Sequence, residues 1–333
     1  MVDIPVFADV QEAQTRIAPY AVRTPMVESP LLSGMRGNCR VFLKLESLQR
    51  TGSFKFRGAA NRILMIPKDL LAAGVVAFSS GNHAQAVAAM AQLLKIPALI
   101  VMPADAPKAK IEGTRAFGAQ IVTYDRVHDD REVIAEKFCK ERGATLIKPY
   151  DDPQVIAGQG TVGLEIAEDA ARMGISLDAV GVPCSGGGLV AGIALALQGA
   201  GVAAFVHSVE PENFDGMRRS LVARTRSTAP GGELSIADAL MAPTPGHHVF
   251  ALADGLLAPG VGVTDQELTQ AVAFAASRLK LLVEPGGAAA LAAFLAGKIE
   301  ARTVVLVISG GNADFSTVAN AVAAHASPLA RSA

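Results

Sequence analysis

A lysine between two phenylalanines is the part of this sequence best suited to covalent chemistry. It is Lys55, in the run Ser53-Phe54-Lys55-Phe56-Arg57-Gly58. Apolar neighbours disfavour the charged ammonium form, so such a lysine loses its proton more readily than an exposed one. A neutral amine can attack an aldehyde and form a Schiff base. For an isolated Phe-Lys-Phe, the commoner alternative is a surface lysine on an amphipathic helix.

A glycine-rich loop provides a candidate site for a phosphate group. The segment Pro183-Cys184-Ser185-Gly186-Gly187-Gly188-Leu189-Val190-Ala191-Gly192 follows a strand-like run and opens a helix-like one. Glycines let backbone N–H groups surround a phosphate, and the helix dipole favours its negative charge. Two alternatives stay open. One is a tight turn needed for packing, and the other is a dinucleotide site with Gly186-x-Gly188-x-x-Ala191 on the pyrophosphate and Glu210 on the ribose. A nucleotide-triphosphate loop is excluded, because no Lys-Ser or Lys-Thr pair follows the glycines.

Two further turns follow strand-like runs and carry polar side chains. In Ser79-Ser80-Gly81-Asn82-His83-Ala84-Gln85, exposed N–H groups could bind a carboxylate while Asn82 donates to a cofactor hydroxyl. In Ile308-Ser309-Gly310-Gly311-Asn312, Ser309 could hydrogen-bond a ring nitrogen. Sheets of α/β proteins bind ligands beyond the carboxyl ends of their strands, where both turns would lie. The alternative is that Ser80, Asn82 and Ser309 cap the helices that follow them.

Alternating strand and helix patterns must position these turns. Apolar strands separated by helices are typical of parallel sheets covered on both faces, so we predict an α/β fold with doubly wound character. The series from about residue 74 to residue 149 could form a small sheet of its own. The expected strands are Arg40–Glu46, Val75–Phe78, Ala98–Met102, Ile121–Tyr124, Ala179–Val182, Ala204–Val209 and Thr303–Ile308. The expected helices include Asn82–Lys95, Asp129–Arg142 and a segment that begins at Pro107 and ends near Gly118.

Composition narrows the class of protein. The 333 residues include 30 Lys and Arg against 31 Asp and Glu, a balance that argues against a nucleic-acid partner or an acidic membrane surface. Half of the residues are hydrophobic, yet no uninterrupted apolar run is long enough to span a membrane. The scattered Cys39, Cys139 and Cys184 favour a reducing compartment over a disulfide framework or a zinc site. The acidic first residues are unlike a signal peptide, so we expect a cytoplasmic protein.

Taken together, these motifs resemble the fold type II pyridoxal-phosphate enzymes, and within them the serine/threonine dehydratase and serine racemase group. They occur in the expected order between about residues 20 and 320, and they are specific as a set although each alone is weak. The motifs are Ser53-x-Lys55-x-Arg57-Gly58, Ser80-Gly81-Asn82-His83, Ser185 to Leu189, Glu284-Pro285-Gly286-Gly287-Ala288 and Ser309-Gly310-Gly311-Asn312.

The resemblance implies a tryptophan synthase β-like architecture of two doubly wound domains, with the cofactor in the cleft between them. Residues 1–73 and 150–333 would form the large, cofactor-binding domain, and residues 74–149 the small domain. The group is commonly dimeric, so a homodimer is expected. Because the chain ends at residue 333, we also expect a catabolic enzyme without the regulatory domain of biosynthetic threonine dehydratases.

The resemblance also assigns residues to pyridoxal 5′-phosphate. Lys55 would hold it as a Schiff base and then exchange a proton with the substrate α-carbon. Phe54 would pack on the pyridine ring, Asn82 would bond its 3′-hydroxyl, and Ser309 would face its nitrogen as a neutral partner. The other cofactor contacts would come from Glu284 and from the backbone N–H groups of Ser185, Gly186, Gly187, Gly188 and Leu189. The implied reaction is α,β-elimination of water from a β-hydroxy amino acid, which yields a 2-oxo acid and ammonia.

The identity of the amino-acid substrate depends on fewer residues. Its expected contacts are Ser79, Ser80, Gly81, Asn82, His83 and Arg131. In related racemases and some hydroxyaspartate dehydratases, a serine at the place of Ser80 acts on the substrate face opposite the lysine. Serine racemase or 3-hydroxyaspartate dehydratase activity is therefore an alternative, with Ser80 as a second catalytic residue. Arg131, otherwise on a solvated helix face, could pair with a second substrate carboxylate. In the family, the segment corresponding to residues 237–246 neighbours the substrate. Here residues 242–246 and the run Glu210-Pro211-Glu212-x-Phe214-Asp215 are more similar to a bacterial branch that includes hydroxyectoine-pathway dehydratases, a further alternative.

Acidic residues after one strand-like run match the place where many of these enzymes bind Mg²⁺, Mn²⁺ or Ca²⁺. The candidate ligands are Glu210, Asp215 and the backbone of Phe214. Where the family usually has a second carboxylate, six residues after Glu210, this chain has Gly216. Because such cations take about six oxygens or more, the alternative is a turn with solvated acids.

Overall fold

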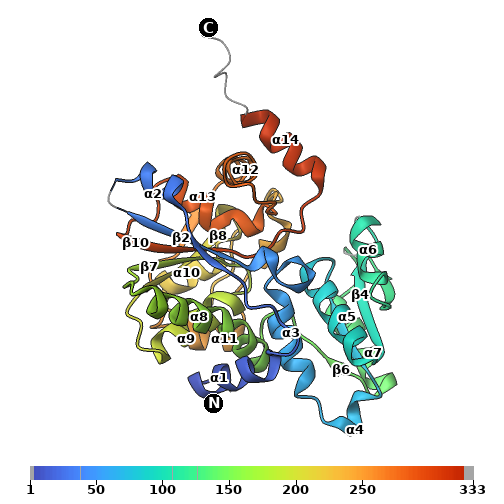
Figure 1. Cartoon of the computed structure of the whole chain (residues 1–333). Helices are drawn as coiled ribbons and strands as arrows, with labels where there is room; N and C mark the ends of the chain where they lie inside the picture. Colours follow the sequence, from blue (N-terminus) through green and yellow to red (C-terminus); the bar gives the residue numbers. More distant parts are fainter. Residues whose placement is uncertain (1–3, 38, 107, 126, 326–333) are drawn as a thin grey trace.

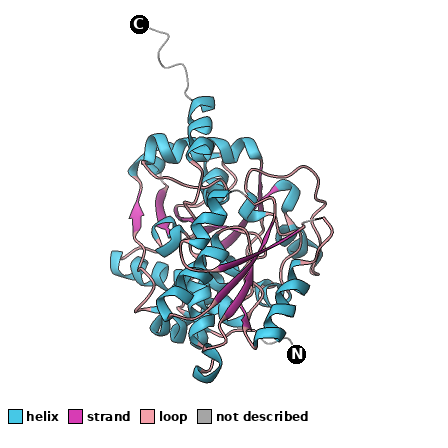
Figure 2. Cartoon of the chain, turned by 90° about the vertical axis from the view of Figure 1, so that its right-hand side faces the viewer, coloured by secondary structure: helices cyan, strands magenta, loops and turns pink. Residues whose placement is uncertain are grey.

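The computed structural model describes residues 4–37, 39–106, 108–125 and 127–325, and it contains two sheets. The larger sheet has six strands and the smaller has four, and helices surround both (Figures 1 and 2). These features confirm the predicted α/β class with doubly wound sheets. None of the helices in the described part of the chain combines the length and apolar character needed to cross a membrane.

The larger sheet brings the carboxyl ends of distant strands to one edge. Its order is β1-β2-β10-β7-β8-β9, in which β1 pairs antiparallel with β2 and the other neighbours are parallel. The bounds are β1 (Met26–Glu28), β2 (Arg40–Leu45), β7 (Ala179–Pro183), β8 (Phe205–Pro211), β9 (Val261–Val263) and β10 (Thr303–Ile308). The turns that follow β7 and β10 therefore leave the sheet beside each other.

Successive side chains of β10 point to opposite faces of the larger sheet and pack into two separate hydrophobic cores, one on each face. Val305 and Val307 pack into the core formed with α1 (Phe7–Ile17), α8 (Pro153–Met173), α9 (Gly188–Gly199) and α11 (His247–Ala253). Val304, Leu306 and Ile308 pack into the core formed with α2 (Pro30–Met35), α12 (Asp265–Phe274), α13 (Ala289–Leu295) and α14 (Phe315–His325). Both faces of these strands are buried, as their nearly continuous apolar sequence predicts.

Glycines let α8 and α9 pack closely beneath the larger sheet. A Cβ atom at Gly192 of α9 would lie 2.6 Å from the carbonyl oxygen of Ile156 in α8. A Cβ atom at Gly163 of α8 would lie 2.8 Å from the carbonyl oxygen of Ile193. Any side chain at these positions would push the helices apart, and with them the glycine loop at the start of α9.

The smaller sheet is all parallel, with the order β5-β4-β3-β6. Its strands are β3 (Val75–Phe78), β4 (Ala98–Pro103), β5 (Gln120–Tyr124) and β6 (Thr145–Leu146). One face packs on α3 (Lys55–Leu64) and α5 (Asn82–Leu94), and the other packs on α7 (Arg131–Arg142). All four strands lie within the range 74–149 predicted for a small domain; the domain boundaries themselves stay a prediction.

The expected elements differ from the observed ones mainly at their ends. Helix α7 begins at Arg131, because the Asp130 carboxylate accepts hydrogen bonds from the amides of Glu132 and Val133 and caps it. The helix predicted from Pro107 to Gly118 is α6 (Lys108–Arg115); Pro107 lies outside the described residues. The remaining α-helices in the described residues are the short α4 (Lys68–Leu71) and α10 (Gly216–Ala223).

Candidate active site

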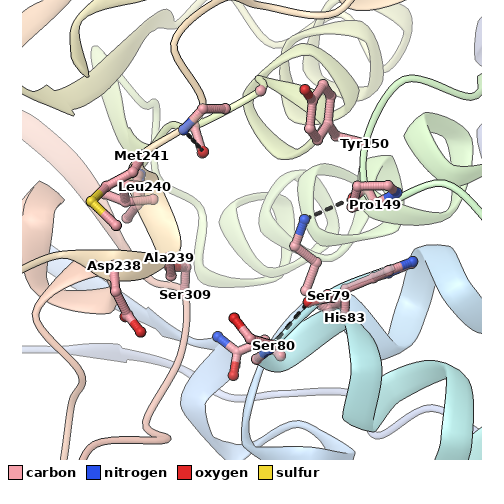
Figure 3. A pocket seen from close by; sticks show the side chains of 18 of the residues that line it. Ser79, Ser80, His83, Pro149, Tyr150, Asp238, Ala239, Leu240, Met241 and Ser309 are labelled. Atoms are coloured by element: carbon pink, nitrogen blue, oxygen red, sulfur yellow. Dashed lines mark hydrogen bonds between the residues drawn. The ribbon is translucent and has the colours of Figure 1, made fainter. Parts of the chain in front are cut away.

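A cavity of about 370 Å³ lies where turns from both sheets meet (Figure 3). Turns after β3, β7 and β10 contribute to its wall, so it lies at carboxyl ends of parallel strands, as predicted. The structure brings together every residue predicted to contact cofactor or substrate: Phe54, Lys55, Ser79, Ser80, Gly81, Asn82, His83, Arg131, Ser185, Gly186, Gly187, Gly188, Leu189, Glu284 and Ser309.

Lys55 is the first residue of α3 and projects into this cavity. The loop before it is fastened to the end of β10, since the amide of Phe54 donates to the carbonyl of Ser309 (3.1 Å). The Lys55 amine donates to the carbonyl oxygen of Pro149 (2.7 Å; Figure 3). Burial lowers its pKa from 10.5 to about 8, against a weaker opposing effect of Glu284. The alternative of an ordinary surface lysine is therefore wrong.

Two residues after Lys55, Arg57 anchors α3 in a fully paired group of buried charges. The buried charge cluster consists of Lys44, Glu46, Arg57 and Glu165, of which Arg57 is 1% exposed. Arg57 donates to Glu46 through Nε and Nη2 (2.8 Å each) and to Glu165 through Nη1 (2.7 Å). Lys44 donates to the other oxygen of Glu165 (2.5 Å). Paired on both sides, the guanidinium holds the start of α3 against β2 and α8.

The glycine loop after β7 is shaped to admit an anion. A Cβ atom at Gly186 would lie 2.3 Å from the ring of Tyr150, and Gly187 has a left-handed φ of 94° as α9 begins. The first amides of a helix have no intrahelical acceptor, which leaves those of α9 available to a phosphate. The structure argues against the dinucleotide alternative, which requires Glu210 to bind a ribose. Glu210 does not line the cavity, and its carboxylate accepts hydrogen bonds from the amides of Met217 and Arg218.

Asn82 and Ser309 do not cap the helices that follow them. Helix α5 begins at Asn82 after Gly81, with no side-chain cap, and α14 begins only at Phe315. The Asn82 side chain instead donates from Nδ2 to Glu284 Oε1 (2.6 Å). Burial raises the pKa of Glu284 to about 7, although the hydrogen bond from Asn82 opposes this shift. Neither the Asn82 nor the Ser309 side chain is used as a helix cap, and both line the cavity.

The remaining predicted substrate contacts lie on the β3 turn and on α7. The Ser79 hydroxyl accepts from the amide of Gly81 (3.2 Å), which shapes this turn. His83 Nε2 lies 2.8 Å from the carbonyl oxygen of Ile147. Burial and the nearby Lys55 lower the pKa of His83 to about 3, so the ring is neutral. Because a carbonyl oxygen can only accept, Nε2 of this neutral ring carries the proton. Arg131 is exposed but also lines the cavity, with its guanidinium carbon 5.4 Å from the centre of the Phe78 ring.

Residues 17–310 match the family model described as "Pyridoxal-phosphate dependent enzyme". The chain belongs to this family. It is 40% identical over 319 residues to the catabolic L-threonine dehydratase TdcB of Staphylococcus aureus (strain USA300), covering 94% of this chain and 91% of the relative. The structure is similar to a threonine deaminase from T.th. (TM-score 0.88, 42% identity, 93% of this chain and 99% of the other). It is also similar to maize serine racemase (TM-score 0.88, 35% identity, 97% of this chain and 100% of the other).

The residues present in this pyridoxal-phosphate enzyme fit its cofactor. The cradle before α9 has no space for a Cβ atom at Gly186 or Gly187, where it would lie 2.3 Å from Tyr150 or 2.6 Å from Val249. Glycine backbone at this point can approach a phosphate closely. An amine of lowered pKa in the same cavity suits the cofactor aldehyde. The predicted cofactor is confirmed by the family match, whereas the role of each residue stays a prediction.

Sequence reasoning missed several side chains around the cavity of this enzyme. The ring of Tyr150 packs against the glycine loop at Gly186. The sequence feature that could have indicated Tyr150 is the polar run between Pro149 and the start of α8. Lys110 of α6 was also missed; it forms an ion pair with Asp238 of the short helix η4 (Asp238–Leu240), which lies in the 237–246 segment expected near the substrate. Both members of this pair line the cavity. Asn312 also lines it; its motif was recognised, but no role was predicted for it.

The carboxylates of the proposed metal ligands already contact other protein groups. The carboxylate of Glu210 accepts from two backbone amides, and burial raises its pKa to about 8. Asp215 pairs with Arg219 (2.5 Å) and Arg218 (3.3 Å). In the described ranges, no three His, Cys, Asp or Glu side chains are grouped so that they could share a metal ion. A divalent cation at Glu210, Asp215 and the backbone of Phe214 stays a prediction, and it would have to compete with these amides and arginines.

Proposed function

We propose that this enzyme eliminates water from a β-hydroxy amino acid of the L-threonine or L-serine type, giving a 2-oxo acid and ammonia. The observation that carries the proposal is the Lys55 amine, which is partly neutral near pH 8 and shares a cavity with the glycine cradle and Ser309. The names of the threonine dehydratase and threonine deaminase relatives support the same reaction class.

Each side chain has a task in this proposal. Bound pyridoxal phosphate would act as an electron sink that makes the α-hydrogen of an amino acid acidic. Lys55 would link the cofactor and then accept the α-proton, which requires an amine that can be neutral. Backbone N–H groups of residues 185–189 would hold the phosphate. Ser309 would present an uncharged hydroxyl to the ring nitrogen, which favours rapid loss of the β-hydroxyl group over long retention of negative charge on the substrate.

The organisation of the molecule forms part of the same proposal. We infer that residues 1–73 and 150–333 form the large domain and residues 74–149 the small one, and that two copies form a homodimer in the cytoplasm. Support for the small domain comes from its own four-stranded sheet and from the cores on its two faces. Size-exclusion chromatography with light scattering would test the dimer.

Reduction with borohydride tests the linkage to Lys55. Purified protein should be yellow, and reduction should change its colour and leave the cofactor attached to Lys55 in a peptide map. A colourless protein that takes up no pyridoxal phosphate would overturn the proposal. Release of 2-oxo acid should then be measured with L-serine, L-threonine, D-serine and the threo and erythro 3-hydroxyaspartates.

A racemase is the second candidate, because Ser80 lines the cavity together with Lys55. Two groups that exchange protons with opposite faces of the α-carbon would invert its configuration. The Ser80→Ala variant should lose racemisation of serine by about 100-fold or more and retain elimination of water from the L-substrate. Equal loss of both reactions would contradict the two-base hypothesis. Arg131 would favour a dicarboxylic substrate, and the 3-hydroxyaspartate assays test this.

A further inference from the structure

One asparagine connects three of the turns that surround the cavity. Asn312 follows β10, and its Nδ2 atom donates to the carbonyl oxygen of Thr51 (2.8 Å) and to Oδ1 of Asn82 (2.7 Å). Asn82 in turn donates from Nδ2 to Oε1 of Glu284 (2.6 Å). The chain of contacts thus runs from the loop before Lys55, through Asn312, to the β3 turn and Glu284.

The carbonyl of Thr51 decides which atoms donate and which accept in this series of hydrogen bonds. A backbone carbonyl such as that of Thr51 can only accept, so Asn312 must present its nitrogen to it. The same nitrogen faces Asn82, which must therefore present its oxygen. The Nδ2 atom of Asn82 is then directed to Glu284, and its second N–H group remains available to a ligand. The amide group of an isolated asparagine can flip, which exchanges its oxygen and nitrogen. The carbonyl of Thr51 fixes the orientation of Asn312, and Asn312 in turn fixes that of Asn82.

Asn312 also holds an unfavourable turn just before Lys55. Thr51 has a φ of 64° and Gly52 a φ of 73°, so two successive residues are left-handed. This conformation is costly for a β-branched residue such as Thr51 and persists only where neighbouring contacts impose it. The contacts are the donation from Asn312 to Thr51 and that from the amide of Gly311 to the carbonyl of Gly52 (2.9 Å). A Cβ atom at Gly52 would lie 2.4 Å from Asn312 Oδ1.

We propose that Asn312 is a positioning residue of the active site. It orients the amide of Asn82 so that an N–H group faces the cofactor hydroxyl, and it holds the Thr51–Gly52 turn that places Lys55. This inference rests on the proposed function, since it assumes that pyridoxal phosphate binds in the cavity. It assigns no contact of Asn312 itself with the reacting atoms.

The Asn312→Asp variant tests the inference with almost no change of shape. A carboxylate cannot donate, so it repels the carbonyl of Thr51, and Asn82 turns its nitrogen toward residue 312 and its oxygen toward Glu284. The dissociation constant of pyridoxal phosphate, measured by titrating the cofactor-free chain, should rise about tenfold or more. The matched control is Asn320→Asp, the same change at an exposed position of α14, which should bind like the wild type.

The pH dependence distinguishes orientation from general damage. Once protonated, the carboxyl group that N312D introduces can donate one hydrogen bond again, so the affinity of this variant relative to the wild type should recover in part as the pH falls toward the ordinary Asp pKa of about 4. Asn312→Ala, which cannot donate at any pH, should show no recovery and about fivefold weaker binding. Circular dichroism checks folding, and if N312D does not fold, the affinity of N312A decides.

The outcomes separate this inference from the proposed function. Wild-type protein that binds the cofactor, with N312D and N312A binding it equally tightly, overturns the role of Asn312 alone. Equal weakening by N312D and N320D overturns it as well, because a charge effect would then suffice. Wild-type protein that binds no pyridoxal phosphate overturns the proposed function and this inference with it.

Discussion

The start of α3 carries two buried basic side chains, Arg57 in the buried charge cluster and Lys55 in the cavity, and they differ in their hydrogen-bond partners. Arg57 belongs to the buried charge cluster, where carboxylates meet the guanidinium on both sides. Burial alone would lower its pKa, but Glu46 and Glu165 outweigh that effect and raise it. Lys55, two residues earlier, donates to a backbone carbonyl instead, and burial lowers its pKa to about 8. Pairing makes Arg57 a structural anchor. Lys55 has no carboxylate contact among the described residues, which makes it an amine that can react.

Two buried glutamates, Glu165 in the cluster and Glu284 in the cavity, show the same difference between a paired and an unpaired charge. Burial opposes ionisation of Glu165, yet Arg57 and Lys44 hold its pKa below the usual range. Glu284 in the cavity receives only a neutral amide donor from Asn82 in the described structure, and its pKa is raised to about 7. A buried carboxylate beside cations stays charged, whereas one beside an amide gains a proton readily. Arg57 and Glu165 in the cluster thus keep their charges over a wider pH range than usual, whereas Glu284 in the cavity does not.

Removal of the reactive amine should have the largest effect. Lys55→Ala should lower kcat for 2-oxo acid formation by about 1,000-fold or more, because no other group could both link the cofactor and accept the α-proton. Steady-state kinetics measure the loss, and Lys137→Ala, at an exposed lysine of α7, is the matched control. A variant that retained about a tenth of the activity would show that the unpaired lysine is not the one that reacts.

Removal of the anchor should act on stability. Arg57→Met leaves Glu46 and Glu165 buried with fewer partners, so the free energy of unfolding should fall by about 3–5 kcal/mol. Urea titration measures the change. Arg40→Ala breaks an exposed ion pair with Glu28 and should cost far less. If the two variants were equally stable, the cluster would not be the anchor that the contrast assumes.

The pH dependence of stability sharpens the comparison of the two glutamates. Between pH 4.5 and 7, Glu284 binds more protons in the folded chain than in the unfolded one, so its contribution to stability falls as pH rises. Glu284→Gln keeps an acceptor for Asn82 and removes this titration. Its stability relative to the wild type should therefore grow by about 1–3 kcal/mol from pH 5 to pH 8 in urea titrations. In the control variant Glu300→Gln, at an exposed position, the free energy of unfolding should depend on pH as it does in the wild type. If E284Q also showed the wild-type pH dependence, the raised pKa of Glu284 would be contradicted.

Much of the fold could be predicted from short stretches of sequence. The apolar run Thr303–Ile308 is β10 without any change of bounds, and Val75–Phe78 is β3. Helix ends were less accurate, because one capping side chain such as Asp130 decides them. The prediction that ligand-suited turns share one edge followed from the direction of parallel strands, and one cavity unites them.

The metal site shows where prediction from local sequence stops. Glu210 and Asp215 are near each other in the chain, as ligands of one ion would be. Their carboxylates are used instead by the amides at the start of α10 and by two arginines. Competition between such partners depends on distances that short sequence motifs do not contain.

By itself, the sequence determined the α/β class and the family and singled out Lys55 as the candidate reactive lysine, because these follow from local periodicity and from residue types at fixed spacing. Only the tertiary structure decided which buried charges are paired. Arg57 meets Glu165, 108 residues away, and Asn312 meets Asn82, 230 residues away. A pKa or the direction of an amide depends on such neighbours within a few ångströms, and these are brought together only when the chain folds.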